Sequence, residues 1–360
     1  MRQMENTQRI SRRSWLQTMA LTGGTILATS CAKRGEPSAA SAPAADYSHE
    51  EYVWMSCHAN LPLFMAHDHP ALRLAGQQLG VQVTIAGPNT SDIPSLISSI
   101  ETIAARRPAG MMVVAWDPSA VVSPINKAVE SGIPVICVDT DAPDSKRLSF
   151  VGTNWFDLGI RQAQAMVKAL AGRKGKVAML GLTEHYIDQQ AFAGFRSVAE
   201  KAGLPLMEPQ NDRGDSAVAA RIAATILQAT PDLVGMAGFD SESGPGMGLA
   251  IKEAGKAGQI VATCVDAEPA HLSLIKEGVL TAAIGQKREL FTYFGLRVLF
   301  ELNHSSLQLC ADDKAAGVWP APDVVYTGSY TVTRDNVDIF IKRGPAATSN
   351  SGRRPSAGRS

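Results

Sequence analysis

A chain of 360 residues, 45% of them hydrophobic, is long enough to fold into two domains with buried cores. Its 34 basic and 34 acidic side chains balance, and without the first thirty residues the count is 30 basic against 33 acidic, a net charge of −3. Nucleic-acid-binding proteins normally carry a basic patch, so this balance argues against that class.

The first 31 residues are typical of an export signal. Twin arginines at positions 12 and 13 precede a modestly apolar stretch over residues 16–28, which is too short and too polar to hold a helix across a bilayer. With the following Trp-Leu pair, the arginines resemble a twin-arginine translocation signal. We therefore predict an extracytoplasmic protein, periplasmic or on the cell surface, exported by the twin-arginine route.

Cys31 lies where a bacterial lipoprotein signal is cleaved and the new terminus is lipidated. It could instead be an incidental cysteine in a stretch rich in Ala and Ser. Residues 32–49 have no apolar period and are expected to form a flexible tether. Together these features predict a lipoprotein anchored to the membrane through Cys31.

Beyond the tether, strand and helix patterns alternate. Continuous apolar runs flanked by Gly and Pro indicate buried strands, whereas an apolar period of about 3.6 residues indicates a helix. Strands are predicted at 52–56, 81–86, 110–115, 133–138, 177–181, 204–208, 233–237, 260–265 and 281–284, and helices at 93–105, 120–130, 158–171, 191–202, 217–229 and 290–302. The alternation predicts an α/β fold with parallel sheets, divided into two sets near residues 152–154, and a disordered tail over 344–360.

Two of these strands run directly into an aspartate, Asp139 and Asp266. Ligands of parallel α/β sheets bind beyond the carboxyl ends of the strands, so both side chains are expected to face a cleft. An ionised carboxylate can accept hydrogens from two neighbouring hydroxyl groups, which favours a polyhydroxylated ligand. Either aspartate could instead cap a following helix, but the repetition in both halves of the chain favours a ligand.

Five segments resemble the periplasmic sugar-binding proteins of ribose type, which are type I periplasmic binding proteins and serve ABC importers. They are Ile133–Asp139, Val151–Asn154, Gly194-Phe195, Val265-Asp266 and Leu280–Gln286, and the resemblance covers about residues 50–340 in matching order. It implies two Rossmann-like lobes joined by a three-crossover hinge, with a monosaccharide or small polyol bound between them and passed to an ABC permease. The implied lobes are residues 50–153 with 287–325 and residues 154–286 with 326–343.

The resemblance also assigns site residues by position. Asp139 and Asp266 match the hydroxyl-binding aspartates of the family, and Gln286 matches a glutamine at the third crossover. Asn60 and Phe64 fall in the first strand–helix loop, where the family places an amide and aromatic rings against the sugar. Phe64 could instead belong to a helix core, and Asn60 could be a turn residue.

One departure concerns the segment before Gly194-Phe195, where ribose-type members carry an arginine. Here Asp188-Gln189 is locally similar to the autoinducer-2 and rhamnose-binding branch, which implies a different hydroxyl pattern in the ligand. Asp188 could equally be a helix N-cap. Arg213, in another cleft-side loop, could replace the missing guanidinium. Further candidates at strand ends are Trp116, Phe239 and Asp240.

Other classes of protein fit less well. The sequence contains no GxSxG, Walker or HExxH motif, and its histidines have no metal-ligand spacing, so we predict no enzyme activity, cofactor or metal. A transcription regulator with the same core would need a DNA-binding headpiece where the export signal lies. A sensor that binds a sugar or autoinducer-2 and signals through a membrane receptor stays open beside transport. We expect a monomer that binds no nucleic acid.

Overall fold

The computed structural model describes residues 45–343, apart from the side chain of Lys314. The predicted export signal, Cys31, the first part of the predicted tether and the predicted tail at 344–360 lie outside the described residues. The chain divides into a unit over Met1–Ala45 and a compact unit over Asp46–Ser360, and all that follows concerns the second. Among its described helices, none is long and apolar enough to cross a membrane.

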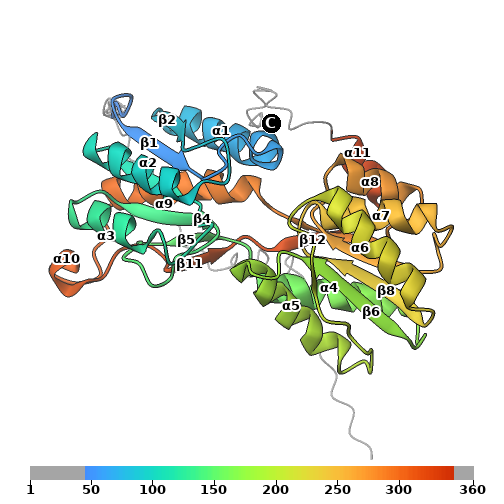
Figure 1. The fold of residues 1–360 in the computed structure, drawn as a ribbon. Coiled ribbons are helices and arrows are strands. Elements are labelled where there is room, and N and C mark those ends of the chain that lie inside the picture. Colours follow the sequence, from blue (N-terminus) through green and yellow to red (C-terminus); the bar gives the residue numbers. More distant parts are fainter. Residues whose placement is uncertain (1–44, 344–360) are drawn as a thin grey trace, which may run out of the picture. The chain divides into compact units, whose positions relative to one another are not determined.

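Two six-stranded sheets form the framework (Figure 1). The first has the order β11-β5-β4-β3-β1-β2 with every pair parallel, and its strands are β1 (Glu51–Met55), β2 (Gln82–Ala86), β3 (Gly110–Val113), β4 (Val135–Asp139), β5 (Phe150–Gly152) and β11 (Val324–Tyr326). The second has the order β12-β10-β9-β8-β6-β7, with β6 (Lys176–Gly181), β7 (Gln210–Asn211), β8 (Leu233–Gly238), β9 (Val261–Val265), β10 (Ala282–Gln286) and β12 (Ser329–Thr333). Only the β10–β12 pair among the described strands is antiparallel.

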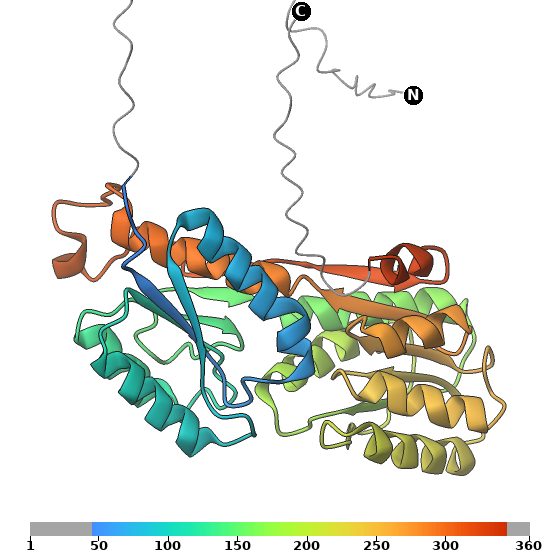
Figure 2. The same ribbon diagram turned by 90° about the horizontal axis from the view of Figure 1, so that it is seen from above.

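Helices cover both faces of the first sheet because its strands are buried on both sides. Along β1, Val53 and Met55 pack with α2 (Ile93–Ala105) and α3 (Val122–Glu130), whereas Tyr52 and Trp54 pack with α1 (His69–Leu79) and α9 (Glu289–His304). A short π-helix, η2 (Phe64–Asp68), leads into α1, and α10 (Asp313–Ala316) follows α9. Figure 2 shows α1, in blue, beside α9, in orange.

The second sheet is built in the same way. One core lies between the sheet and α4 (Trp155–Leu170) and α5 (Tyr186–Ala199), and the other lies between the sheet and α6 (Ser216–Ala229), α7 (Ser243–Glu253) and α8 (Pro269–Lys276). The last described helix, α11 (Val337–Ile341), packs beside α8. Alternate residues of β6 enter opposite cores, Val177 and Met179 on one face and Ala178 and Leu180 on the other.

The chain passes between the two sheets three times, from β5 to α4, from β10 to α9 and from β11 to β12. Each sheet with its helices is called a lobe below. The first lobe contains β1–β5 and β11, and the second contains β6–β10 and β12. We propose the lobe boundaries given by the sequence, 50–153 with 287–325 and 154–286 with 326–343.

Most predicted elements are found with ends shifted by one to three residues, but two predictions were wrong. The segment 204–208 is no strand, and only Leu206 forms an isolated bridge, because the prolines at 205 and 209 remove ladder donors. The paired strand is β7. The helix predicted at 191–202 begins earlier, at Tyr186, because the polar run at 188–190 hides the apolar period of its first turn. The antiparallel β12 is a departure from the purely parallel sheets expected.

Candidate ligand-binding site

Asp139 and Asp266 have the same unusual backbone conformation. Asp139 is the last residue of β4 and has φ +68°, and Asp266 directly follows β9 and has φ +65°. The left-handed region is uncommon for residues other than glycine, and such strain costs about 1–3 kcal/mol and clusters at functional sites. Both side chains are buried. Neither caps a helix, because their hydrogen bonds go to Arg288 and Gln286.

Arg288 lies between β10 and α9, at the second of the three crossovers in chain order rather than the third, and joins two carboxylates of the first lobe. Its Nη1 and Nη2 donate to Oδ1 and Oδ2 of Asp139 at 2.9 and 3.0 Å, and its Nε and Nη2 donate to Asp68 at 3.1 and 3.3 Å. The buried guanidinium also lies 5.1 Å from the ring centre of Phe64 and 5.2 Å from that of Phe291. Burial disfavours its charge, but Asp139 and Asp68 outweigh burial and raise the pKa of Arg288. Asp139 is therefore held by a permanent cation.

Asp266 is held by a neutral group instead. Gln286 Nε2 donates to Asp266 Oδ1 at 2.9 Å, and Thr153 Oγ1 donates to Gln286 Oε1 at 2.9 Å. Burial raises the pKa of Asp266 to about 6, although Arg288 and Gln286 act in the opposite direction. The carboxylate of the second lobe thus carries an incompletely compensated charge.

Asp188 is buried in the first turn of α5. It accepts a hydrogen bond from the backbone N–H of Leu182 at 3.2 Å and lies 3.2 Å from Nδ1 of His185. The N-cap of α5 is His185, so Asp188 is not the cap. The His185 ring stacks on Trp116 of the first lobe at 5.5 Å and 29°, and Trp116 Nε1 donates to Ser56 Oγ at 3.0 Å. These contacts bring the predicted residues Asp188 and Trp116 to the same place between the lobes.

Three other residues predicted for the binding site make packing contacts or hydrogen bonds inside the protein. Phe64 is buried against Trp54 at 5.2 Å between ring centres and against Arg288, which fits its alternative role as helix core. Phe239 is fully buried in the second lobe. Asp240 accepts a hydrogen bond from the backbone N–H of Ser243, the first residue of α7, at 2.8 Å.

A second carboxylate, which sequence analysis missed, lies beside Asp240. Asp212 Oδ2 accepts a hydrogen bond from Ser243 Oγ at 2.5 Å, and its Oδ1 accepts one from the backbone N–H of Gly214 at 3.1 Å. Burial and the neighbouring Asp240 raise the pKa of Asp212 to about 7. The same two causes, burial and a neighbouring carboxylate, also raise the pKa of Asp240.

Asn60, Gln189 and Arg213 are exposed. Asn60 is in a turn, Gln189 donates to the backbone oxygen of Thr183 at 3.1 Å, and Arg213 has φ +62°. The structure does not bring these three side chains to the paired carboxylates. The guanidinium that reaches one of the paired carboxylates is that of Arg288, which the sequence did not predict.

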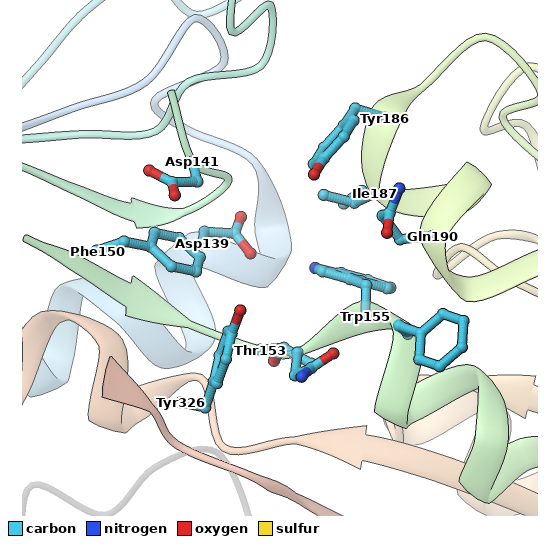
Figure 3. A pocket seen from close by; sticks show the side chains of 11 residues that line it. Asp139, Asp141, Phe150, Thr153, Trp155, Tyr186, Ile187, Gln190 and Tyr326 are labelled. Carbon is cyan, nitrogen blue, oxygen red and sulfur yellow. The ribbon is translucent and has the colours of Figure 1, made fainter. Parts of the chain in front are cut away.

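Asp139 also lines a pocket of about 100 Å³ between the strand ends of the first lobe and the N-termini of α4 and α5 (Figure 3). Its lining combines aromatic and polar side chains. The lining residues are Asp139, Asp141, Phe150, Thr153, Asn154, Trp155, Phe156, Tyr186, Ile187, Gln190 and Tyr326. Among residues 45–343, no group of three or more His, Cys, Asp or Glu side chains is arranged to hold a metal ion.

The family model of the periplasmic binding protein domain matches residues 52–304, and the chain belongs to that family. The chain is 23% identical over 266 residues to the D-allose-binding periplasmic protein of Escherichia coli (strain K12), over 71% of this chain and 83% of that protein. Its fold is similar to a sugar-binding protein of a sugar ABC transporter from Bacillus halodurans, with 31% identity, TM-score 0.75, and coverage of 81% of this chain and 100% of the other. An arabinose-binding protein from Geobacillus stearothermophilus is likewise 31% identical, with TM-score 0.72 and coverage of 81% and 99%. The predicted family and two-lobed α/β fold are confirmed.

Proposed function

We propose that this protein is the extracytoplasmic sugar-binding component of an ABC importer, which captures a monosaccharide or related polyol between its lobes and delivers it to a permease. The observation that carries the proposal is the pair of buried aspartates at equivalent strand ends of the two lobes, both in the left-handed conformation. Its relatives support the ligand class, because they are named for allose and arabinose. The family consists of binding proteins rather than enzymes.

Within the cleft, Asp139 and Asp266 accept hydrogens from ligand hydroxyl groups, and Gln286 adds a neutral partner. Arg288 uses one lone-pair direction on each oxygen of Asp139, so each oxygen keeps another for the ligand. Asp188 contributes a third acceptor, and Trp116 supplies an apolar face beside it. Of the remaining sequence candidates, we retain Asn60, Phe64, Gln189, Arg213, Phe239 and Asp240 only as residues of the surrounding loops and cores.

The binding test is a thermal-shift screen of pentoses, hexoses, deoxyhexoses and autoinducer-2 on the purified protein, followed by calorimetric titration of each hit. A ligand at 100 times its Kd stabilises the folded state by about 2.7 kcal/mol, which raises Tm by several degrees. At least one sugar is expected to do so. If every sugar leaves the melt unchanged and produces no heat, the proposed function is wrong.

We further propose that the protein reaches its place outside the cytoplasm by the twin-arginine route and is anchored by a lipid on Cys31. The twin arginines and the cysteine after the apolar stretch support this. Replacing Arg12 and Arg13 with Lys is expected to retain precursor in the cytoplasm, and Cys31→Ala is expected to abolish labelling with a radioactive fatty acid. Normal export of the double Lys variant would contradict the route.

A further inference from the structure

A buried hydrogen-bond donor without a partner faces the pocket beside Asp139. Trp155, the first residue of α4, is 8% exposed, and its Nε1 has no hydrogen-bond partner among the described residues. Figure 3 shows the nitrogen edge of its indole ring directed toward Asp139. A buried N–H without a partner costs free energy, so a site that keeps one is suited to a ligand that brings an acceptor.

Three other polar side chains of this pocket, those of Asp141, Thr153 and Asn154, are already hydrogen-bonded within the protein. Arg147 binds the carboxylate of Asp141 through two hydrogen bonds of 2.5 and 2.6 Å, and the Thr153 hydroxyl donates to Gln286. Asp139, with acceptor capacity left, and Trp155 therefore form an acceptor and donor pair. No Lys, Arg or His lines the pocket, so it favours a neutral ligand group over an anionic one.

The walls and mouth of the pocket are aromatic. Tyr186 and Tyr326 are 45% and 56% exposed, and the ring of Tyr326 lies edge-on to Phe150 with 6.4 Å between centres. Aromatic faces combined with a few polar groups suit the C–H faces and hydroxyl groups of carbohydrate. About 100 Å³ is less than the 150 Å³ cavity that holds a benzene ring. The enclosed part therefore holds a substituent, and a longer ligand continues outward past the two tyrosines.

This pocket shares one residue with the proposed sugar site. Asp139 lines it, whereas Asp266, Asp188 and Trp116 do not. The hydrogen bond between Thr153 and Gln286 lies between the pocket and Asp266. One carboxylate, Asp139, thus faces both regions.

We propose that the pocket is a second subsite, which receives the substituent of a neutral glycoside whose sugar ring lies in the cleft. Trp155 Nε1–H donates to an oxygen of that substituent, and Asp139 accepts a hydroxyl hydrogen next to it. The inference rests on the proposed function, because it requires a sugar in the cleft. The preferred ligand is therefore larger than a free monosaccharide.

The experiment is calorimetric titration with the free sugar that binds best, its methyl glycoside and disaccharides that contain it. The unmodified protein is expected to bind at least one glycoside roughly tenfold more tightly than the free sugar. Trp155→Phe keeps a ring but removes the donor, so it is expected to weaken that glycoside roughly three- to tenfold while changing the free sugar less than twofold. Trp319→Phe, the same change at an exposed tryptophan outside the pocket, is expected to alter neither.

A second variant tests whether the effect of Trp155→Phe comes only from altered packing. Tyr326 is half exposed, so Tyr326→Ala is expected to leave the melting temperature nearly unchanged and still reduce the advantage of the glycoside. Equal affinity for free sugar and glycosides, or equal weakening of both by Trp155→Phe, would overturn the subsite and leave the proposed function intact. Failure of every sugar and glycoside to bind would remove both.

Discussion

Asp139 and Asp266 occupy equivalent places in the two lobes but have different electrostatic surroundings. Asp139 is bound through both oxygens by Arg288, whereas Asp266 is bound through one oxygen by the amide of Gln286. Burial raises the pKa of Asp266 to about 6, although its backbone conformation is the same as that of Asp139. The same backbone conformation at the end of each strand thus sets the direction of the carboxylate. The neighbouring side chains decide whether its charge is compensated before a ligand binds.

The largest expected effect is on the free energy of unfolding, when the buried cation Arg288 of the first lobe is removed. Arg288→Met leaves Asp68 and Asp139 buried without a charged partner, which is expected to lower the free energy of unfolding by about 3–5 kcal/mol. Urea denaturation measures it. Arg297→Met, on the helix α9 that follows Arg288, is the control, since among the described residues Arg297 hydrogen-bonds to Gln78 and Tyr293 near the surface, and it is expected to cost less than about 1 kcal/mol. Equal losses in the two variants would show that Arg288 does not hold the buried carboxylates.

The next effect concerns ligand affinity. A hydrogen bond to a charged acceptor contributes about 1.5–3 kcal/mol, so Asp139→Ala and Asp266→Ala are each expected to weaken sugar binding roughly tenfold to a hundredfold. Calorimetric titration checks both variants. Asp215→Ala is the control, because Asp215 caps α6 and is expected to cost about 1 kcal/mol of stability with affinity unchanged. Unchanged affinity in both cleft variants would contradict a sugar cleft.

Replacing the two aspartates with Asn is expected to change stability in opposite directions. The folded-state pKa of Asp266, about 6, lies above its ordinary 3.8, so the folded state binds more protons and this group favours folding at low pH. That contribution is lost as pH rises through about 6. Asp266→Asn is therefore expected to melt at a higher temperature than the unmodified protein at pH 7 and to bind sugar more weakly.

The matched variant at the other carboxylate sharpens this contrast. Asp139→Asn weakens a charge-assisted contact with Arg288, so it is expected to melt lower at pH 7. Thermal melts of both Asn variants between pH 4 and 8 measure the contrast. Parallel curves for the two variants would show that the carboxylates are electrostatically alike.

The smallest effect is expected for the neutral partner. Gln286→Ala removes one amide hydrogen bond to Asp266 and one from Thr153, each contributing about 0.5–1.5 kcal/mol. Sugar affinity is expected to fall roughly three- to tenfold, less than in either Asp→Ala variant. A larger loss in titration than that of Asp266→Ala would place the main contact on the amide rather than on the carboxylate.

Local sequence determined the strands and the place of the two aspartates, for a physical reason. A strand buried on both faces must be apolar throughout, so the first polar residue after the run marks its end. The runs before Asp139 and Asp266 are of this kind, and in a parallel sheet such ends face the ligand side. The failed strand at 204–208 shows the limit, because one proline lies within its apolar run, at 205, and another directly follows it, at 209.

Only the tertiary structure decided which groups meet at the site. Arg288 is 149 residues from Asp139 and 220 from Asp68, and its position after Gln286 gives no sign that its side chain turns back into the first lobe. Trp155 lies before the helix predicted at 158–171, and the direction of its N–H depends on packing within the second lobe. The ends of strands can be predicted from local sequence patterns. The partners of a buried charge or of a hydrogen-bond donor depend on how distant segments pack, and short-range periodicity in the sequence does not indicate that packing.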